Sequence, residues 1–126
     1  DGRLEQRGGR HLPPAHELGQ AERDESALAR IMSGAKIELK TESFLWERTG
    51  NICIEFASRG KPSGIAVTEA DFWVHQLVRD DETVVYLMFP IARLKALCAA
   101  CGKVVHGIGD DKTQSAYLLS IKDVAK

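Results

Sequence analysis

The stretch Lys36-Ile-Glu-Leu-Lys40 decides how this chain is interpreted, because it combines a strand pattern with charged side chains. Ile37 and Leu39 alternate with Glu38 and Lys40, and an alternation with a period of two is typical of a β-strand. Glu38 and Lys40 then project from the same face of the strand, about 7 Å apart along the chain. The segment is therefore predicted to present a carboxylate and an ammonium group side by side.

A second alternating segment follows at Asn51-Ile-Cys-Ile-Glu-Phe56. The polar loop Arg48-Thr-Gly-Asn51 separates it from the first segment, so the two are predicted to pair as an antiparallel hairpin. In such a hairpin Glu55 would lie beside Glu38 across the strands. The alternative is that Glu55 is an ordinary cross-strand partner for Lys40 or Lys36.

Further elements are predicted on both sides of this hairpin from apolar periodicity, turn residues and helix-forming composition. Residues 1–12 show no periodicity and are predicted to be a flexible arm before a single domain over residues 13–126. The predicted elements are a helix over 21–32, a helix over 68–77, a central strand over 83–89 that is buried on both faces, a helix over 92–101 and a strand over 116–121. This order predicts an α/β fold in which helices flank one mixed central β-sheet.

The composition limits the classes of function that the chain can have. Its 126 residues are 44% hydrophobic and 28% charged, which predicts one small globular domain rather than a disordered tail or a multidomain enzyme. Seventeen Lys and Arg against eighteen Asp and Glu give a net charge of −1, so a polyanion would have to bind a local basic patch. Three cysteines and no long apolar run predict a soluble protein of the cytoplasm, with no membrane partner.

Glu38 and Lys40 have a chemistry in common, because both can act on a phosphate group. Carboxylate oxygens suit Mg²⁺, which proteins hold through one or two carboxylates together with substrate phosphate oxygens. A lysine can orient an attacking water and offset negative charge on the phosphate oxygens. A Glu-x-Lys triplet taken alone is, however, more often an ion pair in solvent.

Four stretches give this triplet a wider context, and together they span about residues 19 to 120. They are Gly19–Glu25 followed by Ala27-Leu28, then Ile37-Glu-Leu-Lys-Thr-Glu42, then Thr49–Ile65 with Thr68–Trp73, and finally Gly109–Tyr117. With these stretches the chain resembles the PD-(D/E)XK nuclease superfamily, most closely its small phage-type members and the Holliday-junction resolvases. The resemblance implies a restriction-endonuclease-like fold and a metal-dependent DNA endonuclease, active as a homodimer and in the host cell cytoplasm if phage-encoded.

The same resemblance implies that Glu38 binds Mg²⁺ or Mn²⁺ and that Lys40 positions the attacking water. Members of the superfamily usually carry an Asp 10 to 20 residues upstream of this pair, and here Asp24 falls inside the predicted helix. Either Asp24 opens a short strand, or Glu22 or Glu55 takes its place as a metal ligand. If the ligand set is incomplete, the alternative is a non-catalytic module that binds DNA or another protein.

The turn Ser58-Arg-Gly-Lys-Pro-Ser-Gly64 contains two cations and two hydroxyl groups. Arg59, Lys61 and Ser63 are candidate contacts for DNA phosphates, and the alternative is an ordinary exposed loop. Cys98-Ala-Ala-Cys101 with His106 does not predict a zinc site, because structural zinc needs four ligands and no second Cys-x-x-Cys follows.

Overall fold

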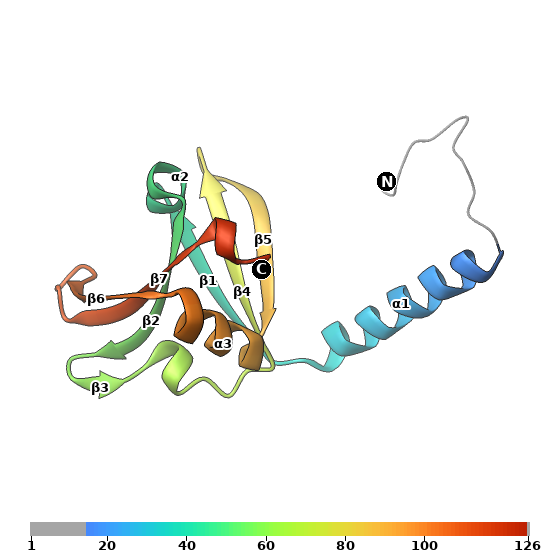
Figure 1. Ribbon diagram of the computed structural model, residues 1–126, viewed down its shortest axis with the longest axis horizontal. Coiled ribbons are helices and arrows are strands. Elements are labelled where there is room, and N and C mark those ends of the chain that lie inside the picture. Colours follow the sequence, from blue (N-terminus) through green and yellow to red (C-terminus); the bar gives the residue numbers. More distant parts are fainter. Residues whose placement is uncertain (1–14, 126) are drawn as a thin grey trace. The chain divides into compact units, whose positions relative to one another are not determined.

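The computed structural model describes residues 15–125, and the chain divides into two units, residues 1–34 and 35–126. In the first unit, α1 (Ala15–Gly34) confirms the predicted helix and extends it in both directions (Figure 1). Helix formers fill most of this segment, and Gly34 stands at its end. The predicted arm over residues 1–12 lies outside the described residues.

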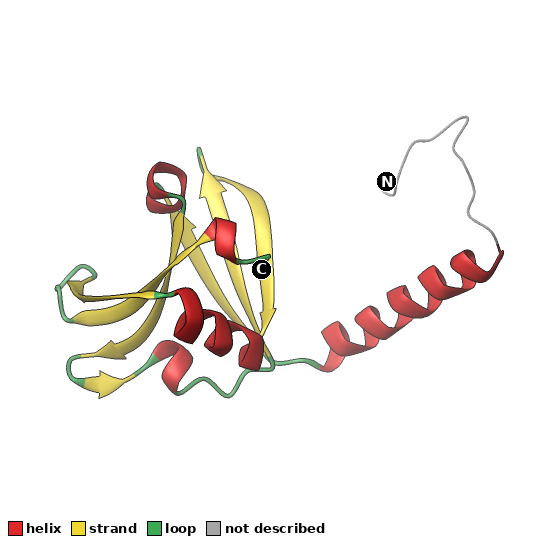
Figure 2. Ribbon diagram, viewed as in Figure 1, coloured by secondary structure: helices red, strands yellow, loops and turns green. Residues whose placement is uncertain are grey.

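The second unit contains two β-sheets and short helices (Figure 2). One sheet has the order β1-β4-β5 and is mixed, because β1 and β4 are parallel whereas β4 and β5 are antiparallel. The other has the order β3-β2-β7-β6 and is antiparallel. The elements are β1 (Ile37–Ser43), α2 (Leu45–Thr49), β2 (Asn51–Ser58), β3 (Lys61–Pro62), η1 (Gly64–Ala66), β4 (Phe72–Arg79), β5 (Glu82–Pro90), α3 (Ile91–Cys101), β6 (Lys103–Ile108), β7 (Gln114–Ser120) and η2 (Ile121–Asp123).

A single apolar core joins the two sheets and α3. Its fully buried side chains come from β2, β4, α3 and β7; the largest are Ile52, Ile54, Trp73, Leu77, Leu94 and Leu119. The inward positions of β2 alternate as predicted, since Ile52 and Ile54 are completely buried. The α/β class is thereby confirmed, as a small domain with one mixed and one antiparallel sheet.

The predicted hairpin between β1 and β2 is wrong. β1 pairs in parallel with β4, so that Glu38 lies opposite Trp73 and Lys40 opposite His75, whereas β2 pairs with β3 and β7. Alternation along a strand does not specify its neighbour, and α2 leads the chain from β1 into the other sheet. The single central sheet of the prediction is accordingly two sheets.

The helix predicted over residues 68–77 is also wrong, because β4 occupies most of that range. Phe72-Trp-Val-His-Gln-Leu-Val78 is rich in aromatic and β-branched residues, which favour a strand. Trp73, His75 and Leu77 alternate toward the interior, a period of two that the helical spacing of the same apolar residues concealed.

The strand predicted over residues 83–89 exists as β5, but it is not buried on both faces. β5 lies at the edge of its sheet, and Tyr86 is 60% exposed. The predicted helix over 92–101 is confirmed as α3, with Leu94, Leu97 and Cys98 buried, although Cys101 is exposed rather than inward. The final predicted strand is confirmed as β7, while α2 and β6 were not predicted.

Candidate functional site

The inward face of β1 is charged, and its outward face is apolar. Glu38, Lys40 and Glu42 are half-buried toward the second sheet, whereas Ile37 and Leu39 are exposed, Leu39 to 53%. The division of these residues between two faces agrees with the prediction. In most strands that border a core the apolar side chains point inward, and in β1 that arrangement is reversed. Charged groups therefore stand where a strand ordinarily contributes to the core.

Lys40 and Glu42 border a cavity of about 360 Å³ between the two sheets. Its polar lining comes from both sheets, and Trp73 forms an apolar part of its wall. The lining residues of interest are Lys40 and Glu42 from β1, Cys53 and Glu55 from β2, His75 from β4 and Gln114 from β7. Two carboxylates and one ammonium group thus face a common space.

Glu38 and Lys40 are in contact, with 3.5 Å between Lys40 Nζ and Glu38 Oε2. Thr68 Oγ1 donates a hydrogen bond to the other carboxylate oxygen of Glu38, at 3.0 Å. Lys40 Nζ also lies 5.7 Å from the centre of the Trp73 ring, within range of a cation–π interaction. Glu38 does not line the cavity itself, so it is linked to that space through Lys40.

Glu55 reaches the cavity from β2, and Ser63 Oγ donates a hydrogen bond of 2.6 Å to Glu55 Oε2. Gly64 makes this contact possible: it has a φ of +53°, and a Cβ atom there would lie 2.2 Å from the carbonyl oxygen of Glu55. Only glycine tolerates both the backbone angle and the close approach. Glu55 therefore lies on the cavity wall, but not in a hairpin beside Glu38.

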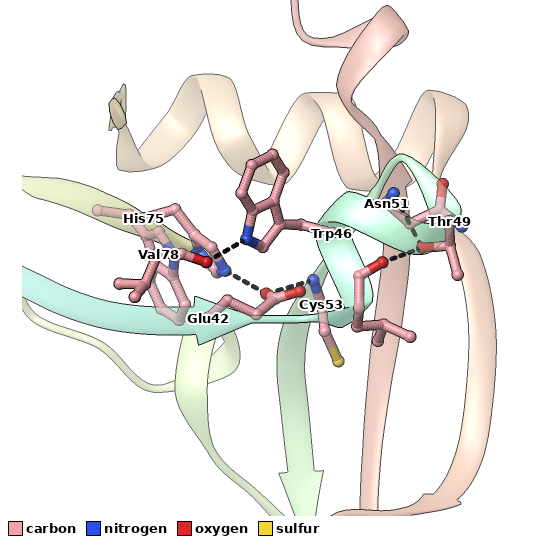
Figure 3. Close-up of polar contacts among 9 residues, drawn as sticks. Glu42, Trp46, Thr49, Asn51, Cys53, His75 and Val78 are labelled. Atoms are coloured by element: carbon pink, nitrogen blue, oxygen red, sulfur yellow. Dashed lines mark hydrogen bonds and ion pairs between the residues drawn. The ribbon is translucent and has the colours of Figure 1, made fainter. Parts of the chain in front are cut away.

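Glu42 lies in the stretch that resembles the superfamily, but the sequence predicted no role for it in the site. Its Oε1 lies 2.6 Å from His75 Nε2 and accepts a hydrogen bond of 3.0 Å from the backbone N–H of Cys53 (Figure 3). Its Oε2 is buried and has no hydrogen-bond partner within the described chain. The signal was present in the strand pattern, since Glu42 follows Glu38 and Lys40 at the next inward position.

His75 is 1% exposed, and the Trp73 indole N–H donates to its Nδ1 at 3.0 Å. A connected series of polar groups therefore runs from Trp73 through His75 to Glu42. Such a buried series fixes the orientation of each member, because every alternative orientation leaves a polar atom unpaired.

Two carboxylates of the cavity wall act on the Cys53 thiol. Burial, followed by the charges of Glu42 and Glu55, raises the pKa of the Cys53 thiol to about 11. The thiol therefore remains protonated near neutral pH and is a poor nucleophile there. The carboxylates of Glu42 and Glu55 thus act on the cavity from the side opposite in charge to the Lys40 ammonium group.

The predicted phosphate-binding turn does not line this cavity. Arg59 is exposed and forms an ion pair with Asp111, with 2.9 Å between Nη2 and Oδ2. The hydrogen bond from Thr113 and, to a smaller extent, that from Arg59 hold the pKa of Asp111 below its usual value. Lys61 is exposed on β3, and the hydroxyl of Ser63 is bound to Glu55.

The remaining candidate ligands are distributed elsewhere. Glu22 and Asp24 lie on α1, in the first unit, with exposed side chains. Cys98 is buried, Cys101 is exposed, and His106 bonds to Ser115. The structure thus brings together Lys40, Glu42 and Glu55, and Glu38 through Lys40.

Within residues 15–125, no three Asp, Glu, His or Cys side chains are close enough to hold a metal ion by themselves. Mg²⁺ does not require this, because it is often held by one or two carboxylates and completed by substrate phosphates and waters. The unpartnered Oε2 of Glu42 and the carboxylate of Glu55 are oxygen donors of the kind that Mg²⁺ or Mn²⁺ prefers. The cavity therefore contains oxygen donors of the kind that a hard cation binds.

No protein-family model matches the sequence, and the comparisons with curated proteins and with solved structures also give no match. In the described part of the chain, no helix has the length and apolar character needed to cross a membrane.

Proposed function

We propose that the chain is a metal-dependent endonuclease with a restriction-endonuclease-like fold that hydrolyses DNA phosphodiester bonds. The observation that supports this most directly is the contact between Glu38 and Lys40, at the border of a cavity that also contains the carboxylates of Glu42 and Glu55. It agrees with the resemblance of the sequence to the PD-(D/E)XK superfamily.

In this proposal Lys40 acts on the attacking water and on the phosphate oxygens. Its contact with Glu38 and with the Trp73 ring keeps the ammonium group at the cavity wall. There it can hydrogen-bond the water in line with the phosphorus and offset the charge that develops on the phosphate. Mg²⁺ or Mn²⁺ would be held by the Glu55 carboxylate on the cavity wall together with the phosphate, with Glu38 joined to the site through Lys40, and would supply Lewis acidity and a more acidic bound water.

The test is cleavage of plasmid and branched DNA in the presence of Mg²⁺ or Mn²⁺. Replacing Lys40 with alanine is expected to reduce the cleavage rate at least 100-fold, a typical loss for a group that acts on the transition state. Lys103→Ala, which removes an exposed lysine of β6, serves as the matched control and should cleave like wild type. Cleavage that survives Lys40→Ala unchanged would contradict the proposed function.

A second candidate function is a DNA-binding module that does not cut. It is favoured by one observation, that the described residues contain no group of three metal ligands. This candidate expects binding that weakens steeply with salt, because phosphate contacts dominate it, and no cleavage with either metal.

A further inference from the structure

We infer that Glu42 is the acid missing from the ligand set: its Oε2 binds a hard divalent cation, and Trp73 and His75 are the positioning residues that aim it. The inference rests on the proposed function for the use of that cation. The cation site itself rests on the hydrogen bonds of Glu42 and on its place in the cavity wall.

The hydrogen bonds of His75 determine where its proton lies. The Trp73 indole is a donor only, so the Nδ1 that it approaches at 3.0 Å must accept. The proton of the neutral imidazole is then on Nε2, which donates to Glu42 Oε1 at 2.6 Å. Both ring nitrogens are engaged, and His75 itself is therefore not available as a ligand.

The same contacts divide the two oxygens of Glu42. Oε1 accepts from His75 and from the backbone N–H of Cys53, whereas Oε2 is buried without a partner in the described chain. A buried carboxylate oxygen without a donor is costly, and native structures satisfy nearly all such groups. The hydrogen bonds from Trp73 to His75 and from His75 to Glu42 thus hold Glu42 in an orientation that leaves one of its oxygens for a group outside the chain.

The surroundings select the class of that group. Glu42 and Glu55 both line the cavity and supply carboxylate oxygens there. Such oxygens suit a hard cation such as Mg²⁺ better than a soft metal, which prefers thiolate and imidazole, and both nitrogens of His75 are already engaged. Carboxylates that bind metals are commonly hydrogen-bonded by a second group that fixes their orientation, as His75 does here for Glu42.

The experiment is a Mg²⁺ titration of the full chain without DNA, followed by the chemical shift of the Cys53 amide. This N–H donates to Glu42 Oε1, so it reports directly on the carboxylate. In wild type we expect a saturable shift, and in Glu42→Gln no saturation over the same millimolar range. Trp73→Phe, which removes the donor to His75, should weaken binding about tenfold. Glu82→Gln removes one exposed acid of β5 and should bind like wild type.

Saturable binding in Glu42→Gln, or none in wild type, would overturn the inference. These results are independent of the cleavage assay. If Glu42 binds Mg²⁺ but wild type cuts no DNA, the cation site stands and the proposed function fails. If Lys40 is required for cleavage but Glu42→Gln binds Mg²⁺ normally, the function stands and the role of Glu42 fails.

Discussion

β1 and β2 lie in different sheets and face the same cavity, yet their inward side chains differ in kind. β2 buries Ile52 and Ile54 completely and is part of the apolar core. β1 turns Glu38, Lys40 and Glu42 toward the interior and leaves its aliphatic side chains exposed.

In the proposed function, this difference separates the residues that stabilise the fold from those that act on the substrate. Burial of aliphatic surface stabilises the fold, whereas burial of charge costs free energy unless each group finds a partner. A strand with inward charges is thus expected to contribute little to stability for its size. The predictions below test this contrast between β1 and β2, beginning with the largest effect.

The largest effect is expected in β2. Ile54→Ala removes a fully buried side chain from the core and should lower the free energy of unfolding by about 3 kcal/mol, measured by urea denaturation. The matched variant Leu39→Ala removes a similar side chain from the exposed face of β1 and should cost only about 0.5 kcal/mol.

A loss at Leu39 comparable with that at Ile54 would break the contrast. It would mean that the outward face of β1 is covered in solution, so that β1 contributes to a second apolar core.

The next effect concerns the polar interior beside β1. Trp73→Phe leaves Nδ1 of His75 without a donor and removes part of a fully buried ring, so we expect a loss of about 2 kcal/mol in urea denaturation. Trp46→Phe is the matched control. Its indole donates to the carbonyl of Val78 in a partly buried position, where water can replace it, and its loss should be smaller. Equal losses would show that the bond to His75 adds nothing.

The strand β2 and the helix α3 were predictable from the sequence because a single local pattern decides each of them. Ile52 and Ile54 alternate with polar residues, and Leu94, Leu97 and Cys98 repeat at helical spacing, so burial followed directly. In β4, apolar residues satisfy both a helical and a strand period, and pairing with β1 and β5 in the same sheet decides between them. The pairing of β1 with β4 is a long-range contact that alternation does not encode.

The candidate site was predictable to a similar degree. The contact of Glu38 with Lys40 follows from their spacing on one strand. Glu42 was overlooked because its importance comes from His75, 33 positions further along the chain, which could be placed beside it only after β4 was known to be a strand. Arg59 appeared free for phosphate in the sequence, but Asp111, from a distant loop, is paired with it.

A smaller effect is expected at Cys53 of β2, because the charge of Glu42 from β1 acts on its thiol. Because the folded pKa is about 11 and the usual value is 9.0, the unfolded thiol ionises first. The protonated thiol therefore contributes fully to the free energy of unfolding below pH 9, and this contribution is lost as the pH rises from 9 to 11.

The same thiol gives a test of Glu42. Removing the charge in Glu42→Gln should lower the pKa of Cys53 and speed its alkylation by iodoacetamide several-fold at pH 8. Mass spectrometry separates this reaction from that of the exposed Cys101. An unchanged rate would show that Glu42 does not act on the thiol.

The smallest effect on stability is expected where the loss of activity should be greatest. Lys40 and Glu38 remain 43% and 35% exposed, so water screens their ion pair and it contributes little to folding. Lys40→Met keeps the aliphatic part of the side chain against Trp73, and its free energy of unfolding should stay within about 0.5 kcal/mol of wild type. A loss approaching that of Ile54→Ala would make Lys40 a structural residue and would remove the reason to regard the inward charges of β1 as functional. Unchanged stability together with lost cleavage would show that the inward charges of β1 serve the reaction, whereas the inward side chains of β2 stabilise the fold.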